Sequence, residues 1–256
     1  MCLILFAAHT HSAYPLVVAA NRDERFDRPA APARWWSDAP GVLAGRDLQG
    51  RGTWMGVARD GRWAAVTNVR EPRVPQRPDA PSRGWLVADF LRGSTGPHAY
   101  LAELAPRGGE WNGFNLLAGD AEGVWWLSNR AVGPVPIPPG VHGVSNALLD
   151  TPWPKVERGR DDLSRILAGP DDDMEEALFR TLALRDPAPD ARLPDTGVGT
   201  ELERSLSSLF IAMPGYGTRA STVLRIRRDG LVRFTERTID PESGRWTEVR
   251  HEFEVG

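Results

Sequence analysis

The first twenty residues constrain the fold most, because two apolar segments flank one short polar turn. Residues 3–8 and 16–20 are apolar throughout, and most of the seven residues between them are polar or turn-forming. This pattern predicts a β-hairpin centred near residue 12. Residues whose numbers sum to about 25 should then lie opposite one another. Cys2 is therefore expected across from Arg22 and Asp23, at a cross-strand distance of about 5 Å.

Strand and helix signals alternate along the rest of the chain. Further strands are expected at 41–44, 53–58, 63–68, 114–118, 124–128, 208–213, 222–228, 231–238 and 246–255. Helical spacing of apolar residues predicts helices after Ser82, over 98–104, around Leu163 and from Asp171, and the Pro- and Gly-rich segment 186–200 is expected to be a loop. Such a pattern indicates an α+β protein whose antiparallel sheets have helices on their outer faces. Without an internal repeat or a linker, residues 1–256 are predicted to form one domain.

Composition excludes several classes of protein. The chain has 31 Lys and Arg against 34 Asp and Glu, a net charge of −3, so it lacks the basic character of a nucleic-acid partner. No apolar run reaches the roughly 18–20 residues of a transmembrane helix, and the apolar N-terminus has no basic flank typical of a signal peptide. A single cysteine excludes a disulfide framework. We predict a cytoplasmic protein, and its oligomeric state stays open.

Cys2 follows the initiator methionine directly. Removal of Met1 would make it the N-terminal residue, with a thiol and an α-amine on the same carbon. An α-amine has a reference pKa of about 7.7–8.0 and can act as the base that activates a nucleophile. Taken alone, a cysteine at position 2 is more often a small buried strand residue. The functional interpretation therefore depends on its neighbours.

The polar block Asn-Arg-Asp-Glu at residues 21–24 ends the second apolar segment. Arg22 beside the thiol would lower its pKa and favour the thiolate. Asp23 could hold the α-amine or a substrate N–H through a charge-assisted hydrogen bond. Glu24, one residue further along the strand, is expected to point to the opposite face.

Three more polar groups lie at strand ends. Asn68 ends the strand 63–68, Asn146 follows an apolar segment, and Arg219 lies in a polar stretch that precedes a strand. An asparagine amide at a strand end is a candidate donor to an oxyanion. The alternative, an asparagine that only forms a turn, is equally common at such places.

Seven motifs in order along nearly the whole chain resemble the signature series of the NRDE family, also called the transport and Golgi organisation 2 family. The motifs are MC at 1–2, NRDE at 21–24, GTWMGV at 52–57, TNVR at 67–70, GFNLL at 113–117, SNALLDTPWPKV at 145–156 and GTRAST at 217–222. That family is similar to N-terminal-nucleophile hydrolases of the choloylglycine hydrolase and penicillin V acylase type. The resemblance implies a four-layer αββα sandwich with Cys2 as nucleophile. The site residues that it implies are Cys2, Arg22, Asp23, Asn68, Asn146 and Arg219.

Two functions from different classes follow from these residues and from the resemblance. In the first, the chain hydrolyses a non-peptide C–N bond of a small acyl amide and needs no cofactor or metal. In the second, which the resemblance implies because members of the family are linked to haem handling, it is a non-catalytic intracellular haem carrier. Arginines would then pair with the propionates, and Cys2, His9, His11 or His142 would ligate the iron. A pure scaffold function would leave the cluster around Cys2 unexplained.

Both functions make one geometric prediction. The polar side-chain atoms of Arg22, Asn68, Asn146 and Arg219 should line a single pocket that also contains the sulfur of Cys2.

Overall fold

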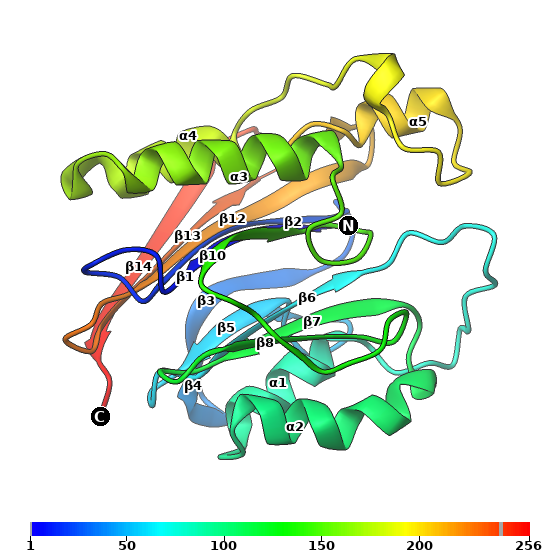
Figure 1. Cartoon of the computed structure of the whole chain (residues 1–256). Coiled ribbons are helices and arrows are strands. Elements are labelled where there is room, and N and C mark those ends of the chain that lie inside the picture. Colours follow the sequence, from blue (N-terminus) through cyan, green and yellow to red (C-terminus); the bar gives the residue numbers. More distant parts are fainter. Residues whose placement is uncertain (1, 241–242) are drawn as a thin grey trace.

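The computed structural model describes residues 2–240 and 243–256 and shows two antiparallel sheets packed face to face (Figure 1). The strands of the first sheet are β1 (Cys2–Ala8), β2 (Leu16–Arg25), β10 (Gly140–Val144), β11 (Ala212–Met213), β12 (Tyr216–Ile226), β13 (Leu231–Ile239) and β14 (Trp246–Glu254). The strands of the second are β3 (Ala30–Trp36), β4 (Ala39–Asp47), β5 (Met55–Ala58), β6 (Trp63–Asn68), β7 (Phe114–Gly119), β8 (Val124–Ser128) and β9 (Val135–Pro136). The first sheet has the order β10-β1-β2-β12-β13-β14, with β11 beside β12, and the second runs in sequence order.

Helices cover the outer face of each sheet. The α-helices are α1 (Gly84–Arg92), α2 (Pro97–Leu104), α3 (Pro154–Leu167), α4 (Met174–Leu182) and α5 (Thr200–Ser205), and the short 3-10 helices are η1 (Ala105–Glu110), η2 (Asp171–Asp173) and η3 (Asp190–Arg192). Helices α3 and α4 lie on the first sheet, and α1 and α2 lie on the second (Figure 1). The order of layers is therefore helix, sheet, sheet, helix, which confirms the predicted αββα sandwich. No helix in the described ranges is long and apolar enough to cross a membrane.

Alternation along β1 and β2 decides which side chains reach the space between the sheets. On β1, Ile4 and Phe6 pack between the sheets, whereas Leu3 and Leu5 pack beneath α3 and α4. Because successive side chains of a strand point to opposite faces, Cys2 belongs to the side between the sheets. On β2, Val18 and Ala20 lie between the sheets, whereas Val17 and Ala19 lie beneath the helices. Residues 22 and 24 therefore share the face of Cys2, and residue 23 faces the helices.

The predicted N-terminal hairpin is confirmed, with Cys2 paired to Arg22, so that paired numbers sum to 24 rather than about 25. The predicted strand at 208–213 is wrong except for its last two residues. The backbone of this segment makes hydrogen bonds outside the sheet. The N–H of Phe210 donates to the Leu184 carbonyl at 2.8 Å, and the Leu209 carbonyl accepts from Asn21 Nδ2 at 2.9 Å. Strands β3, β9 and β10 lie where the sequence predicts no strand, and α5 begins at the end of the predicted loop.

Candidate active site at Cys2

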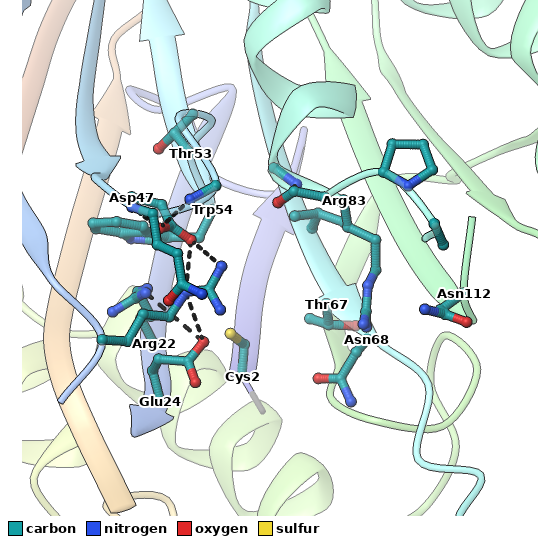
Figure 2. A pocket seen from close by; sticks show the side chains of 18 of the residues that line it. Cys2, Arg22, Glu24, Asp47, Thr53, Trp54, Thr67, Asn68, Arg83 and Asn112 are labelled. Carbon is teal, nitrogen blue, oxygen red and sulfur yellow. Dashed lines mark hydrogen bonds and ion pairs between the residues drawn. The ribbon is translucent and has the colours of Figure 1, made fainter. Parts of the chain in front are cut away.

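A cavity of about 710 Å³ opens beside Cys2, and both sheets contribute to its walls. The first sheet supplies the start of β1, the end of β2 and the start of β12. The second sheet supplies the ends of β4 and β6, and the segment that leads into α1 closes one side (Figure 2). We call this cavity the Cys2 pocket. Its lining includes Cys2, Arg22, Asp23, Glu24, Arg28, Asp47, Thr53, Trp54, Thr67, Asn68, Arg77, Arg83, Asn112 and Tyr216.

Cys2 is the half-buried first residue of β1, and its main chain is fixed on both sides. It pairs with Arg22 in the ladder, and its carbonyl accepts a hydrogen bond of 2.9 Å from Ser145 Oγ. Burial raises the pKa of the Cys2 thiol, and the charge of Asp23 raises it further. A hydrogen bond from the Asp23 backbone and the charge of Arg22 act in the opposite direction. The thiol is therefore the resting form, and a base is needed to make it a nucleophile.

One wall of the pocket is a network of alternating charges (Figure 2). The buried Arg22 lies with its guanidinium carbon 4.5 Å from the ring centroid of Trp54, and its Nη2 is 3.8 Å from Glu24 Oε2. Arg28 links that carboxylate to the next, because its Nε is 3.6 Å from Glu24 and its Nη2 is 2.8 Å from Asp47 Oδ2. Glu24 lines the Cys2 pocket on the same face of β2 as Arg22, so the prediction that it points to the opposite face, away from the site, is wrong.

Asp23 lies next to the site, on the face of β2 that is turned toward the helices. Its side chain is 1% exposed, and its Oδ1 accepts a hydrogen bond of 2.7 Å from Thr218 Oγ1 on β12. Tyr216 donates to its carbonyl oxygen at 3.1 Å. Burial raises the pKa of Asp23, whereas the charges of Lys155 and Arg22 and the bond from Thr218 lower it.

The two predicted asparagines form a relay, and they do not line the pocket side by side. Asn146 is fully buried, and its Nδ2 donates to both the carbonyl and the Oδ1 of Asn68, each at 3.1 Å. Asn68 itself lines the Cys2 pocket. Among the described residues its Nδ2 makes only a long contact of 3.5 Å, with the Val69 carbonyl. Asn146 therefore orients Asn68, whose amide N–H group is available to a ligand.

Arg219 lies outside the lining of the Cys2 pocket, in contrast to the prediction. Its Nη1 donates to three backbone carbonyls of the short segment at the end of β2, those of Arg25, Phe26 and Arg28, at 2.9, 3.1 and 3.0 Å. The pairing of β12 with β2 shifts between Thr218 and Ala220, so Arg219 is the extra residue of a β-bulge. It fastens the segment that carries Arg28 and thereby supports the wall of the pocket.

The sequence interpretation missed the residue opposite Arg22. Arg83 precedes α1, and Figure 2 shows its side chain across the pocket from Arg22, with Cys2 between them. Its Nη1 donates to the Gly113 carbonyl at 3.3 Å, and burial lowers the pKa of Arg83. The segment that carries Arg83 packs closely against Gly52. A Cβ at residue 52 would lie 2.3 Å from the Gly84 carbonyl carbon, so only glycine allows this approach. The GTWMGV motif was the available signal, but nothing local connects residue 52 with residue 84.

The three candidate histidine ligands do not line the pocket in the part of the chain that the structure describes. His142 is engaged at both ring nitrogens, 2.7 Å from Asp150 Oδ2 and 3.0 Å from the Pro138 carbonyl. His9 and His11 lie in the turn between β1 and β2, at the end of the strands opposite to Cys2. Over residues 2–240 and 243–256, no group of three or more His, Cys, Asp or Glu side chains could hold a metal ion.

Comparisons with known proteins give one family. The model of the family described as Transport and Golgi organisation 2 matches residues 1–241. The chain is 37% identical to the Transport and Golgi organization protein 2 homolog of Bos taurus, over 100% of this chain and 99% of that protein. It is 35% identical to the Homo sapiens homolog over 99% of each chain, and 28% identical to the Drosophila melanogaster protein over the full length of both.

Two solved structures are similar at low sequence identity. One is the Caenorhabditis elegans ortholog of N-acylethanolamine-hydrolyzing acid amidase, with a TM-score of 0.47, 11% identity, and coverage of 87% of this chain and 92% of that one. The other is a mutant conjugated bile acid hydrolase from Clostridium perfringens, with a TM-score of 0.42, 10% identity, and coverage of 100% and 97%.

Proposed function

We propose, on the premise that this chain belongs to the Transport and Golgi organisation 2 family, that it is a cysteine amidohydrolase acting on a small acyl amide. One observation carries the proposal: the Cys2 thiol lies in a polar pocket between a buried arginine, Arg22, and an oriented amide donor, Asn68. Membership of a family does not establish hydrolysis. The proposal therefore depends on the chemistry that these side chains can perform.

The reaction begins once Met1 is removed and the α-amine of Cys2 is free. This amine takes the thiol proton as the sulfur attacks the substrate carbonyl carbon, so a C–S bond forms and the carbonyl oxygen becomes an oxyanion. Asn68 Nδ2 donates to that oxyanion, and Asn146 keeps the amide of Asn68 in place. When the tetrahedral intermediate collapses, the C–N bond breaks and the ammonium group returns the proton to the leaving nitrogen. Water then attacks the thioester, which releases the acid and restores the thiol.

The pocket walls favour an acyl amide that carries an anionic group. Arg22 and Arg28 are compensated by Glu24 and Asp47. Arg83 forms a single long hydrogen bond to a backbone carbonyl, and no carboxylate oxygen of the described chain pairs with it. It is the cation best placed to bind an anion of the substrate. Arg83 lines the pocket, whereas Arg219, which the sequence predicts as a site residue, does not.

The test is acylation of Cys2 by a panel of acyl amides with and without an anionic group. Intact mass first establishes whether Met1 has been removed, and a second mass measurement then detects the acyl-enzyme. We expect turnover and acylation in the unaltered chain and neither in Cys2→Ala, with the fold retained. A matched control, Arg51→Ala, changes an exposed arginine outside the pocket lining and should leave both unchanged. If no amide acylates Cys2 in protein whose α-amine is free, the proposal is wrong.

A second candidate, non-catalytic haem binding, is favoured by the arginines of the same pocket, which could pair with propionates. The histidines do not fit this function, because none of the candidates lines the described pocket. The Cys2 thiolate is the iron ligand that the pocket offers. Titration of haem into micromolar protein should then give a shifted Soret band that Cys2→Ala abolishes. An unshifted band in the unaltered protein would exclude this candidate.

A further inference from the structure

His142 is a buried histidine whose two ring nitrogens both face hydrogen-bond acceptors. The residue lies in the middle of β10, is 8% exposed, and stacks on Phe6 of β1 with ring centroids 5.4 Å apart. Its Nδ1 is 2.7 Å from Asp150 Oδ2, and its Nε2 is 3.0 Å from the carbonyl oxygen of Pro138. A carbonyl oxygen only accepts, so Nε2 carries a proton. The proton between the other two atoms belongs either to Nδ1 or to the carboxyl group of Asp150.

The surroundings of Asp150 assign that proton to His142. Two N–H donors reach the second carboxylate oxygen, since the backbone nitrogen of Gly143 lies 2.9 Å from Oδ1 and Nη1 of Arg160 on α3 lies 3.5 Å from it. Burial raises the pKa of Asp150, but the hydrogen bonds from His142 and Gly143 hold it below its ordinary value. The bond to Asp150 raises the pKa of His142, against burial and the charge of Arg160. An imidazolium donates to both acceptors at once.

Asp150 also closes a loop. Its own N–H donates to the Gly143 carbonyl at 2.8 Å, so the two residues are joined by hydrogen bonds in both directions. Asp150 has a φ of +54°, in the left-handed region that residues other than glycine rarely adopt. Such a backbone persists where surrounding contacts hold it. Here these contacts are the bonds that His142 and Gly143 make with the Asp150 side chain.

The loop that Asp150 closes, residues 145–149, contacts both sides of the candidate active site. Ser145 Oγ donates to the Cys2 carbonyl at 2.9 Å, and Asn146 Nδ2 donates to the carbonyl and the Oδ1 of Asn68, each at 3.1 Å. One loop therefore reaches the main chain of the nucleophile and the amide that is expected to bind the oxyanion.

The two ends of this loop are held in different ways. At its beginning, the Ser145 carbonyl accepts from Thr67 Oγ1 at 2.6 Å, and the Ala147 carbonyl accepts from Asn115 Nδ2 at 2.8 Å. These bonds come from the second sheet. At its end, the loop is held by Asp150, and the side chain of Asp150 is bound by β10 and α3 of the other half of the sandwich.

We infer that His142 is a positioning residue, which as an imidazolium binds Asp150 and thereby fixes the loop whose side chains contact the nucleophile and the oxyanion donor. This inference rests on the proposed hydrolase function and deepens it. A neutral imidazole has one N–H and can donate to only one of the two acceptors. Since the folded pKa lies above the ordinary value of 6.5, both bonds are present below pH 6.5, and one is lost as the pH rises through the folded pKa.

Nitrogen-15 NMR of the five histidine side chains tests the charge of His142 without a substrate. Ring nitrogen shifts distinguish the imidazolium from each neutral tautomer, and the signals that disappear in His142→Gln belong to this residue. We expect a titration midpoint above 6.5, with both nitrogens protonated below it. Asp150→Asn should lower the midpoint by about one pH unit, because the anion that favours the cation is removed. A midpoint at or below 6.5 in the unaltered protein would overturn the inference.

The positioning is tested on the side-chain amide signals of Asn68 and Asn146, identified with an alanine variant of each. In the unaltered chain both signals should shift with the midpoint of His142, and in His142→Gln this shift should vanish. His98→Gln is the matched control, because His98 is exposed and stacks on Trp125 of the second sheet. It should leave midpoint and shifts unchanged. Amide signals that stay constant while His142 titrates would show that the loop does not depend on it, which overturns the inference.

Two further measurements keep the test decisive. If His142→Gln does not fold, Asp150→Asn replaces it, and the midpoints of His142 and of the two amide signals should fall together; separate midpoints would refute the coupling. With an acylating amide in hand, His142→Gln should lower kcat about threefold below the midpoint and leave KM unchanged. The NMR titrations need no substrate. Their failure is therefore distinct from failure of the proposed hydrolysis, which is tested by acylation of Cys2.

Discussion

Glu236 allows a prediction with a magnitude and a sign. The residue lies on β13 between the sheets and is 1% exposed. Its Oε1 accepts the N–H of Ala33 at 2.7 Å, and its Oε2 is 3.4 Å from Thr222 Oγ1. Burial raises the pKa of Glu236 from 4.5 to about 7, although these two hydrogen bonds and the charge of Arg22 lower it. The folded protein therefore prefers the protonated acid.

The raised pKa makes the free energy of unfolding depend on pH. Below pH 4.5 the group is protonated in both states and contributes no pH dependence. As the pH rises to 7 the unfolded chain ionises more readily, so the folded state loses stability, and above pH 7 the loss is constant. A difference of about 2.5 pH units corresponds to about 3 kcal/mol. Glu236→Gln removes the ionisation and keeps an oxygen that can accept from Ala33.

The assay is urea unfolding of both proteins at pH 4.5 and at pH 8, with the midpoint and slope recorded. We expect near-equal stability at pH 4.5 and a variant more stable by up to about 3 kcal/mol at pH 8. Glu254→Gln, at an exposed position near the end of β14, is the matched control and should give the same small difference at both pH values. A difference between Glu236→Gln and the unaltered protein that does not change with pH would refute the reasoning.

Three further predictions concern the supports of the Cys2 pocket. Asn146→Ala should lower kcat for an acylating amide about tenfold with little change in KM, because Asn68 loses the donor that orients it; an unchanged kcat would mean that the relay has no part in the reaction. Arg219→Met should lower the free energy of unfolding by about 1–3 kcal/mol, since three backbone carbonyls lose their donor, and urea unfolding would contradict this if the midpoint stayed the same. Gly52→Ala should destabilise by about 2–3 kcal/mol, because its Cβ would lie 2.3 Å from the backbone of Gly84; a thermal midpoint equal to that of the unaltered protein would show that the loop can move aside.

The parts of the site that depend on local strand geometry were predictable from sequence. A hairpin fixes its own register, so the proximity of Cys2 and Arg22 follows from two apolar segments and the turn between them. The position of Asn68 at a strand end and beside the pocket follows from the pattern of the strand 63–68.

The remaining site residues depend on features that a pattern does not encode. A one-residue bulge in β12 leaves Arg219 unpaired in the ladder and directs it to the backbone after β2. Asn146 follows β10 and lies outside the strand ladder. The alternation of side chains along a strand therefore does not predict whether Asn146 lines the pocket or lies behind Asn68.

The Cys2 pocket takes its walls from both sheets, and this has a consequence for thermal stability. Cys2 and Arg22 belong to one sheet, and Asn68 and Trp54 lie in or beside the strands of the other. A ligand that contacts both walls adds contacts between two layers that already meet through apolar side chains and a few polar contacts, such as the one between Ala33 and Glu236. It binds the folded state only, so it should raise the melting temperature by an amount that grows with the logarithm of the ligand concentration divided by its Kd. A thermal-shift screen would therefore find substrates, products and carried ligands alike, before any reaction has been identified.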